Sequence, residues 1–158
     1  MTRGVEATAE APAARARVPM AFERVAERVR ERVRTADLGR IDAVVALARG
    51  GVVPGALVAY ELGVPLRLLR LRFRDDANVP LGAAPSVDED VPDVRGLRVL
   101  IVDDVSVSGA TLRAAQAALG TEAVTLVVKG APGAADVILF DDVPSCVVWP
   151  WFEDVAGG

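Results

Sequence analysis

Two adjacent aspartates, Asp103 and Asp104, follow an apolar run and precede a short segment of small and hydroxyl-bearing residues. Small residues in this segment, 105–111, allow the backbone to wrap around an anion, and the start of a following helix directs free N–H groups at it. Further hydroxyl donors come from Ser106, Ser108 and Thr111. Because a carboxylate pair repels phosphate, the aspartates are expected to face sugar hydroxyls or a divalent cation. The pattern favours a small phosphorylated ligand, although a simple capped turn would use the same residue types.

Two further clusters are expected at the same edge of the fold. Arg49-Gly50-Gly51 follows one predicted strand, and Lys129 stands at the tip of another. In open α/β sheets, ligands bind outside the carboxyl ends of the strands, where Asp103 and Asp104 are also predicted to lie. Backbone N–H groups and one local arginine are sufficient to hold a small phosphorylated ligand. Lys129 is also compatible with a solvated strand end.

The elements that must position these clusters alternate between strand and helix. An amphipathic helix is predicted from Val18, with apolar residues at 22, 25, 29 and 33, and a stop near Gly39. Strands are predicted over 41–48, 65–73, 97–102, 123–128, 137–140 and 146–149. Helices are predicted from near Pro54 to about 62 and from near 111 to about 120. This alternation predicts an α/β fold with a mostly parallel sheet flanked by helices.

The sequence also predicts how the chain is divided. Residues 1–17 lack apolar periodicity and are interpreted as a flexible tail, with a partner-binding arm as the alternative. Residues 18–158 are predicted to form a single domain. The segment 74–96 contains three prolines and an acidic run, and a connection of this length is either functional or partly disordered. A mobile lid and an inert insertion are both compatible with its composition.

Composition excludes several functional classes. The chain has 158 residues, 52% of them hydrophobic and only 4% aromatic, so it can bury an aliphatic core. Its net charge of −4 argues against a general nucleic-acid binder. Because Cys146 is the single cysteine, an intramolecular disulfide is excluded. Because the chain also has no histidine, neither a zinc site nor a Ser-His or Cys-His nucleophile is expected. No apolar run approaches the roughly 18 residues of a membrane span, and no secretory signal is visible, so a cytoplasmic protein is expected.

Four segments resemble type I phosphoribosyltransferases in the correct order. VLIVDDVSVSGATL (99–112) resembles the signature that binds 5-phospho-α-D-ribosyl 1-pyrophosphate (PRPP). VVALARGGVVPGALVAYELG (44–63) resembles the pyrophosphate loop, particularly that of the xanthine-guanine (6-oxopurine) branch. TLVVKG (125–130) matches the strand that carries a base-reading lysine, and VVWPWFED (147–154) is similar to the branch's C-terminal ending. The resemblance implies a Rossmann-like three-layer fold with a small C-terminal hood over 130–158.

The resemblance also implies roles for individual residues. Asp103 and Asp104 would hold the ribose hydroxyls and Mg²⁺, and together with Arg49 they would form the catalytic set. Arg49, Gly50 and Gly51 would bind pyrophosphate, with a cis peptide bond before Arg49. The 5′-phosphate would be held by the turn Ser106, Val107, Ser108, Gly109, Ala110 and Thr111. The segment 74–96 would close over the reacting centre as a lid.

Two positions depart from the family pattern at the expected base site. The 6-oxopurine enzymes carry an aspartate three residues after the second acidic residue, where this chain has Val107, which cannot exchange a proton. The branch's stacking tryptophan corresponds to Cys146, and Trp149 either substitutes for it or only packs. The base-binding set is therefore predicted as Lys129, Val107, Cys146 and Trp149.

The sequence thus predicts a Mg²⁺-dependent enzyme that transfers the phosphoribosyl group from PRPP to a purine-type nucleobase. The alternative is a PRPP- or nucleotide-binding regulatory protein that keeps the pocket without transfer activity. A receiver domain is disfavoured because its acidic pair belongs at the first strand. A dinucleotide-binding domain is disfavoured because no G-x-G-x-x-G follows a strand. PRPP and a nucleobase are the expected partners, and a homo-oligomer is possible.

Overall fold

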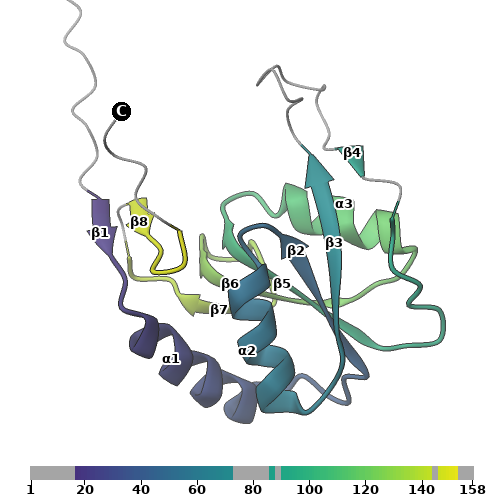
Figure 1. The fold of residues 1–158 in the computed structure, drawn as a ribbon, viewed down its shortest axis with the longest axis horizontal. Helices are drawn as coiled ribbons and strands as arrows, with labels where there is room; N and C mark the ends of the chain where they lie inside the picture. Colours follow the sequence, from purple (N-terminus) through teal and green to yellow (C-terminus); the bar gives the residue numbers. More distant parts are fainter. Residues whose placement is uncertain (1–16, 73–85, 88–89, 144–145, 153–158) are drawn as a thin grey trace, which may run out of the picture.

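The computed structural model describes residues 17–72, 86–87, 90–143 and 146–152, which form a six-stranded sheet, a two-stranded ribbon and three helices. The strand order of the large sheet is β4-β3-β2-β5-β6-β7 (Figure 1). These strands are β2 (Ala43–Ala48), β3 (Leu66–Arg72), β4 (Ser86–Val87), β5 (Val99–Ser106), β6 (Val124–Gly130) and β7 (Val137–Phe140). All neighbouring pairs are parallel except β3 with β4. The predicted mostly parallel α/β fold is therefore confirmed.

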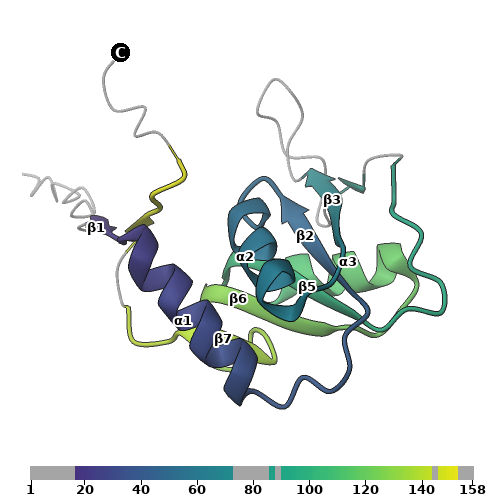
Figure 2. The ribbon, with the colours of Figure 1, turned by 60° about the horizontal axis from the view of Figure 1, so that its bottom comes forward.

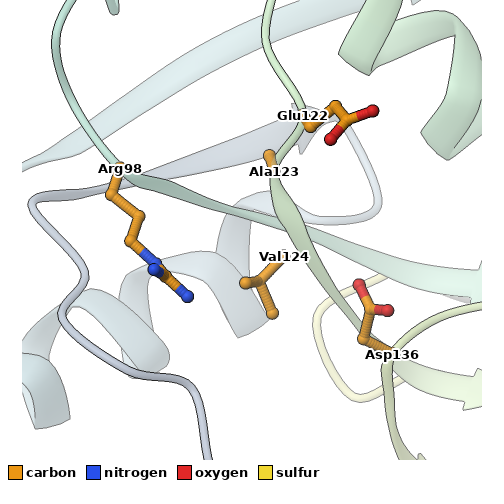
Figure 3. Close-up of a pocket in the computed structure, with 5 residues that line it drawn as sticks. All are labelled: Arg98, Glu122, Ala123, Val124 and Asp136. Atoms are coloured by element: carbon orange, nitrogen blue, oxygen red, sulfur yellow. The ribbon is translucent and has the colours of Figure 1, made fainter.

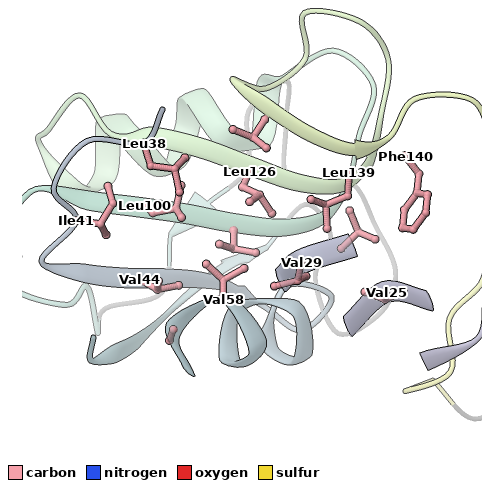
Figure 4. Close-up of a cluster of buried hydrophobic side chains, with 14 of the residues drawn as sticks. Val25, Val29, Leu38, Ile41, Val44, Val58, Leu100, Leu126, Leu139 and Phe140 are labelled. Atoms are coloured by element: carbon pink, nitrogen blue, oxygen red, sulfur yellow. The ribbon is translucent and has the colours of Figure 1, made fainter. Parts of the chain in front are cut away.

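The helices cover both faces of the sheet. Helices α1 (Phe22–Thr35) and α2 (Val52–Leu62) pack on one face, and α3 (Ala110–Leu119) packs on the other (Figures 1 and 2). A buried cluster on the α1–α2 side joins Val25 and Val58 to Leu100 and Leu126 (Figure 4). A second cluster places Leu112 of α3 against Ile101. Because successive strand side chains alternate between faces, the continuous apolar runs of β2, β5 and β6 supply both cores and hold three layers together.

Helix α1 is shorter than the sequence predicts. Val25, Val29 and Val33 lie on its inward face, as predicted. Val18, however, belongs to strand β1 (Arg17–Pro19), which pairs in parallel with β8 (Cys146–Val148). Val18 fits the helical spacing by coincidence. The residue with which it pairs, Val147, lies more than 100 residues away in the sequence. The β1–β8 ribbon lies beyond β7, on the opposite side of the molecule from β4 (Figure 1).

Several element boundaries also differ from the predicted ones. The predicted strand over 97–102 continues as β5 through Asp103 and Asp104 to Ser106. β6 likewise includes Lys129, which was predicted at the strand tip. Residues 137–140, within the predicted hood, extend the main sheet as β7. The predicted tail and lid lie largely outside the described residues, apart from β1, β4 and 90–96. Within the predicted hood, residues 144–145 and 153–158 also lie outside them.

The three helices of the described part of the chain are too short, with 14, 11 and 10 residues, to cross a bilayer. The longest, α1, also carries five arginines, at positions 24, 28, 30, 32 and 34.

Candidate active site

The turns that follow β2 and β5 meet at the carboxyl edge of the sheet. β2 and β5 are adjacent parallel strands, with Ala46 opposite Val102. A methyl group built on Gly50 would overlap the carboxylate of Asp104, and one on Gly51 would overlap the carbonyl oxygens of Val102 and Leu47. The two glycines are therefore required by close approach, and the first turn lies directly against the acidic pair.

The β2–α2 turn presents its arginine outward. The Ala48–Arg49 peptide bond is cis, as the sequence resemblance implied. The amide of Gly51 donates to the carbonyl of Leu47 at 2.8 Å, and that of Gly55 donates to the carbonyl of Gly51 at 2.8 Å. These bonds carry the chain directly into α2, while the Arg49 side chain is exposed. The turn thus places an exposed arginine at the start of a helix, next in sequence to Gly50, which lies against Asp104.

Asp103 and Asp104 are a closely spaced, poorly solvated pair. Asp103 is only 8% exposed. Its carboxylate accepts a hydrogen bond from the Asp104 amide at 2.9 Å, and the Asp104 carboxylate accepts one from the Val105 amide at 2.8 Å. Burial, followed by the neighbouring Asp104 charge, raises the pKa of Asp103 to about 8, and burial also raises the pKa of Asp104. The pair therefore favours hydroxyl groups or a cation that would relieve the buried negative charge.

The β5–α3 turn is tightened by its own hydroxyl groups. The Ser106 hydroxyl accepts a hydrogen bond from the Gly109 amide at 3.1 Å, and the Ser108 hydroxyl accepts one from the Ala110 amide at 3.3 Å. Gly109 has φ 73°, a left-handed conformation that suits glycine. Thr111 stands in the first turn of α3 and is half-buried. Two of the amides predicted to hold phosphate therefore donate to hydroxyl groups within the turn in this structure.

The residues predicted to read a base fall in different places. Val107 lies in the β5–α3 turn and is 76% exposed. Lys129 is opposite Val105 in the β5–β6 pairing, one strand from the acidic pair. Trp149 is 5% exposed and stacks on Trp151, with ring centroids 5.0 Å apart. Cys146 is an exposed free thiol in β8, beside Arg17. The sheet itself thus brings Lys129 towards the site, whereas Cys146 belongs to the ribbon.

Comparison with known proteins decides the family. The family model of the phosphoribosyl transferase domain matches residues 17–155 of the sequence. The chain belongs to this family. Its fold is that of a purine phosphoribosyltransferase from Pyrococcus horikoshii, with a TM-score of 0.72 and 23% identity over 87% of this chain and 94% of that one.

Two curated relatives of this phosphoribosyl transferase domain have different roles. An orotate phosphoribosyltransferase from Brucella ovis is 34% identical over 120 residues, which are 73% of this chain and 57% of that protein. The transcriptional regulator GfcR from Methanocella arvoryzae is 35% identical over 74 residues, 46% of this chain and 36% of the regulator. The chain thus spans little more than half the length of the first and about a third of the second.

Three contributors to the geometry of the candidate site were missed by the sequence analysis. The Arg113 guanidinium donates to the Ser108 carbonyl at 2.9 Å and braces the β5–α3 turn. The amide of Ala131, just after β6, donates to the Ser106 carbonyl at 3.1 Å. Phe152 lies beneath the Arg49 guanidinium, whose central carbon is 5.9 Å from the ring centroid. Of the three, only Arg113 lies close in sequence to the turn that it contacts, four residues after Gly109. Only this residue could therefore have been recognised from the local sequence.

The acidic pair fits Mg²⁺ as a partial ligand set. Among the described residues no group of three or more His, Cys, Asp or Glu side chains is placed to hold a metal ion. Mg²⁺ commonly uses one or two carboxylates and completes its shell with water and substrate phosphates. The carboxylates of the buried Asp103 and the half-buried Asp104, which repel each other, have the donor chemistry for this arrangement.

A separate hollow lies at the other end of the sheet. Its volume is about 400 Å³, and it is lined by Arg98, Glu122, Ala123, Val124 and Asp136 (Figure 3). These residues precede or begin β5, β6 and β7, whereas the candidate site lies after β2 and β5. Within the hollow, Asp136 accepts hydrogen bonds from the amide and hydroxyl of Thr125 at 2.9 and 2.8 Å. This carboxylate therefore has a structural role in joining β6 to the start of β7.

Proposed function

We propose that this protein is a Mg²⁺-dependent phosphoribosyltransferase that transfers the 5-phosphoribosyl group from PRPP to a purine-type nucleobase and releases pyrophosphate. The observation that carries the proposal is the contact of Gly50 with the Asp104 carboxylate. It joins the turn proposed to bind pyrophosphate to the pair proposed to hold the ribose. In PRPP the pyrophosphate is attached to C1 of the ribose, next to the carbons that carry the ring hydroxyls, so the two groups need adjoining sites of this kind.

In the proposed reaction the bond between ribose C1 and the pyrophosphate oxygen breaks, and its electron pair leaves with pyrophosphate. A base nitrogen then forms a bond to C1 from the opposite face and loses its proton. Asp103 and Asp104 would orient the ribose hydroxyls and offset the positive charge that develops at C1. Arg49 would offset the charge that grows on pyrophosphate, which is electrostatic catalysis. Mg²⁺, when bound, would neutralise part of the pyrophosphate charge.

The purine-type acceptor is proposed from the strand that carries Lys129. A lysine ammonium can donate a hydrogen bond to an exocyclic base oxygen, and β6 places this residue one strand from the acidic pair. Val107 cannot take the proton from the base, so the proton would pass to water or to another group. Trp149 is buried and already stacks on Trp151, which favours a packing role.

The test is a screen of nucleobases with PRPP and Mg²⁺ in which pyrophosphate release is measured. Release with hypoxanthine, guanine, xanthine or adenine supports the proposal, and release with orotate alone would replace the purine by a pyrimidine acceptor. Asp103→Asn and Asp104→Asn are expected to reduce turnover or PRPP affinity at least tenfold while the fold survives. Unchanged kinetics in both variants would remove the catalytic assignment.

The alternative is a regulatory protein that binds PRPP or a nucleotide without transfer. It is favoured by the exposed Val107 at the position of the expected acid and by the partial match to a transcriptional regulator. Binding of PRPP in a calorimeter, combined with no pyrophosphate release for any base, would support this alternative.

We also propose self-association through the side of α2 and β3 that the described residues leave uncovered. Pro54, Gly55, Val58 and Ala59 face the core, yet Tyr60 is 85% exposed, and Leu66 and Leu68 of β3 are 38% and 50% exposed. A helix apolar on most sides is normally buried. A second copy is the proposed occupant because, under two-fold symmetry, each of these three uncharged side chains can lie near its equivalent. A cytoplasmic location and the lack of a nucleic-acid partner remain predictions.

A further inference from the structure

The chain turns back after β8 and brings an aromatic ring to Arg49. The amide of Phe152 donates to the Trp149 carbonyl at 3.2 Å and closes this C-terminal turn, 149–152. The central guanidinium carbon of Arg49 lies 5.9 Å from the centre of the Phe152 ring. This distance is within the range of cation–π attraction. Two residues more than 100 positions apart in the sequence are therefore in contact.

The position of Phe152 is fixed by the core. Trp149 is buried at 5% exposure, and its ring lies parallel to that of Trp151 with an angle of 8° between the planes. Phe152 and Trp151 pack against the cluster beneath α1 and α2. On the other side, the Met20 amide donates to the Val148 carbonyl at 3.1 Å, which ties β8 to the start of α1. The ring is thus anchored independently of the β2–α2 turn.

Arg49, by contrast, has an exposed side chain on a turn. An arginine loses considerable rotamer freedom when it binds a ligand, and holding it in place beforehand reduces this loss. We infer that Phe152 is a positioning residue that holds the Arg49 guanidinium over the β2–α2 turn for pyrophosphate. This inference rests on the proposed function, in which Arg49 binds pyrophosphate. It assigns the C-terminal turn a role in leaving-group binding, separate from base recognition.

The test compares two ligands by calorimetry in the presence of Mg²⁺. Pyrophosphate probes the Arg49 turn, and ribose 5-phosphate probes the acidic pair and the β5–α3 turn. Phe152→Leu is expected to weaken pyrophosphate binding about two- to fivefold, as an exposed cation–π contact implies, and to leave ribose 5-phosphate binding unchanged. Phe152→Tyr keeps the ring and is expected to bind both ligands like the wild type. Phe22→Leu, at an exposed aromatic of α1, is the matched control and is expected to change neither affinity.

A double variant separates positioning from a general structural effect. In an Arg49→Gln background, Phe152→Leu is expected to cause no further loss of pyrophosphate affinity. The inference is wrong if Phe152→Leu binds pyrophosphate as the wild type does, or if both ligands weaken together. If the wild-type protein binds neither ligand, the proposed function and this inference both fail. If the wild type binds pyrophosphate and Phe152→Leu binds it equally well, only the inference on Phe152 fails, and the proposed function stands.

Discussion

At the scale of single residues, burial of the Asp103 carboxyl is expected to lower the free energy of unfolding at neutral pH. Its ordinary pKa is 3.8, and burial with the adjacent Asp104 charge raises it to about 8 in the folded protein. Between these values the folded state binds more protons than the unfolded state, so stability falls as pH rises. The ligand-free protein is expected to lose up to about 1.4 kcal/mol of unfolding free energy per pH unit from this group. Thermal melts between pH 4 and 8 measure this slope.

Asp103→Asn is the matched variant for that prediction. An asparagine oxygen can still accept the hydrogen bond from the Asp104 amide, but it carries no charge. The variant is therefore expected to melt higher than the wild type at pH 8 and to approach it near pH 4. Equal pH dependence in the two proteins would show that Asp103 is well solvated or already ion-paired.

The exposed Val107 offers a second test at this scale. Because it is 76% exposed, Val107→Asp is expected to change the unfolding free energy by no more than about 0.5 kcal/mol. If the site takes 6-oxopurines, the added carboxylate supplies the missing proton acceptor, and general acid–base catalysis contributes about 100-fold or more. Turnover with hypoxanthine or guanine should then rise. Intact PRPP binding without such a rise would point to another acceptor or to the regulatory alternative.

At the scale of elements, the meeting of two turns depends on Gly50. A methyl group at this position would overlap the Asp104 carboxylate, so Gly50→Ala is expected to separate the turns and weaken pyrophosphate binding at least tenfold. Gly63→Ala is the control, because Gly63 has φ 68° with no neighbour within 4 Å of the added methyl group. It is expected to cost about 1 kcal/mol of stability with unchanged affinity. Equal affinities in both variants would contradict the proposed contact.

Most elements could be predicted from local patterns. The apolar runs of β2, β5 and β6 identified buried strands, and the spacing of Val25, Val29 and Val33 identified α1. The end of β5 could not be predicted, because Asp103 and Asp104 read as a turn signal while the pairing with β6 extends the strand to Ser106. Val18 was misassigned for a similar reason, since its partner Val147 lies near the other end of the sequence.

The candidate site was predictable only in its local parts. The sequence placed Arg49, the acidic pair and the Ser106–Thr111 turn at strand ends, and the parallel sheet brings them to one edge. Contacts between distant segments left no such pattern. The Phe152 ring beside Arg49 and the Ala131 amide on Ser106 arise from tertiary packing, which the spacing of residues does not encode.

At the scale of the whole molecule, the uncovered α2–β3 face predicts self-association. Tyr60→Glu and Leu68→Arg each place a charge on this face, and burying an unpaired charge is costly. Both variants are expected to shift the protein towards the monomer, as measured by light scattering after gel filtration. Glu122→Arg, an exposed change far from the face, serves as the control. A wild-type protein that is monomeric at all concentrations tested would refute the proposed self-association.

The stacked indoles of the C-terminal turn give the molecule an internal optical probe. The chain has two tryptophans, and both belong to this one turn, with rings nearly parallel at 5.0 Å. Their emission and their coupled near-ultraviolet dichroism therefore originate from a single place next to Phe152. Loosening of this turn during heating or ligation will be visible without any attached dye, and it can be followed separately from melting of the tryptophan-free central sheet.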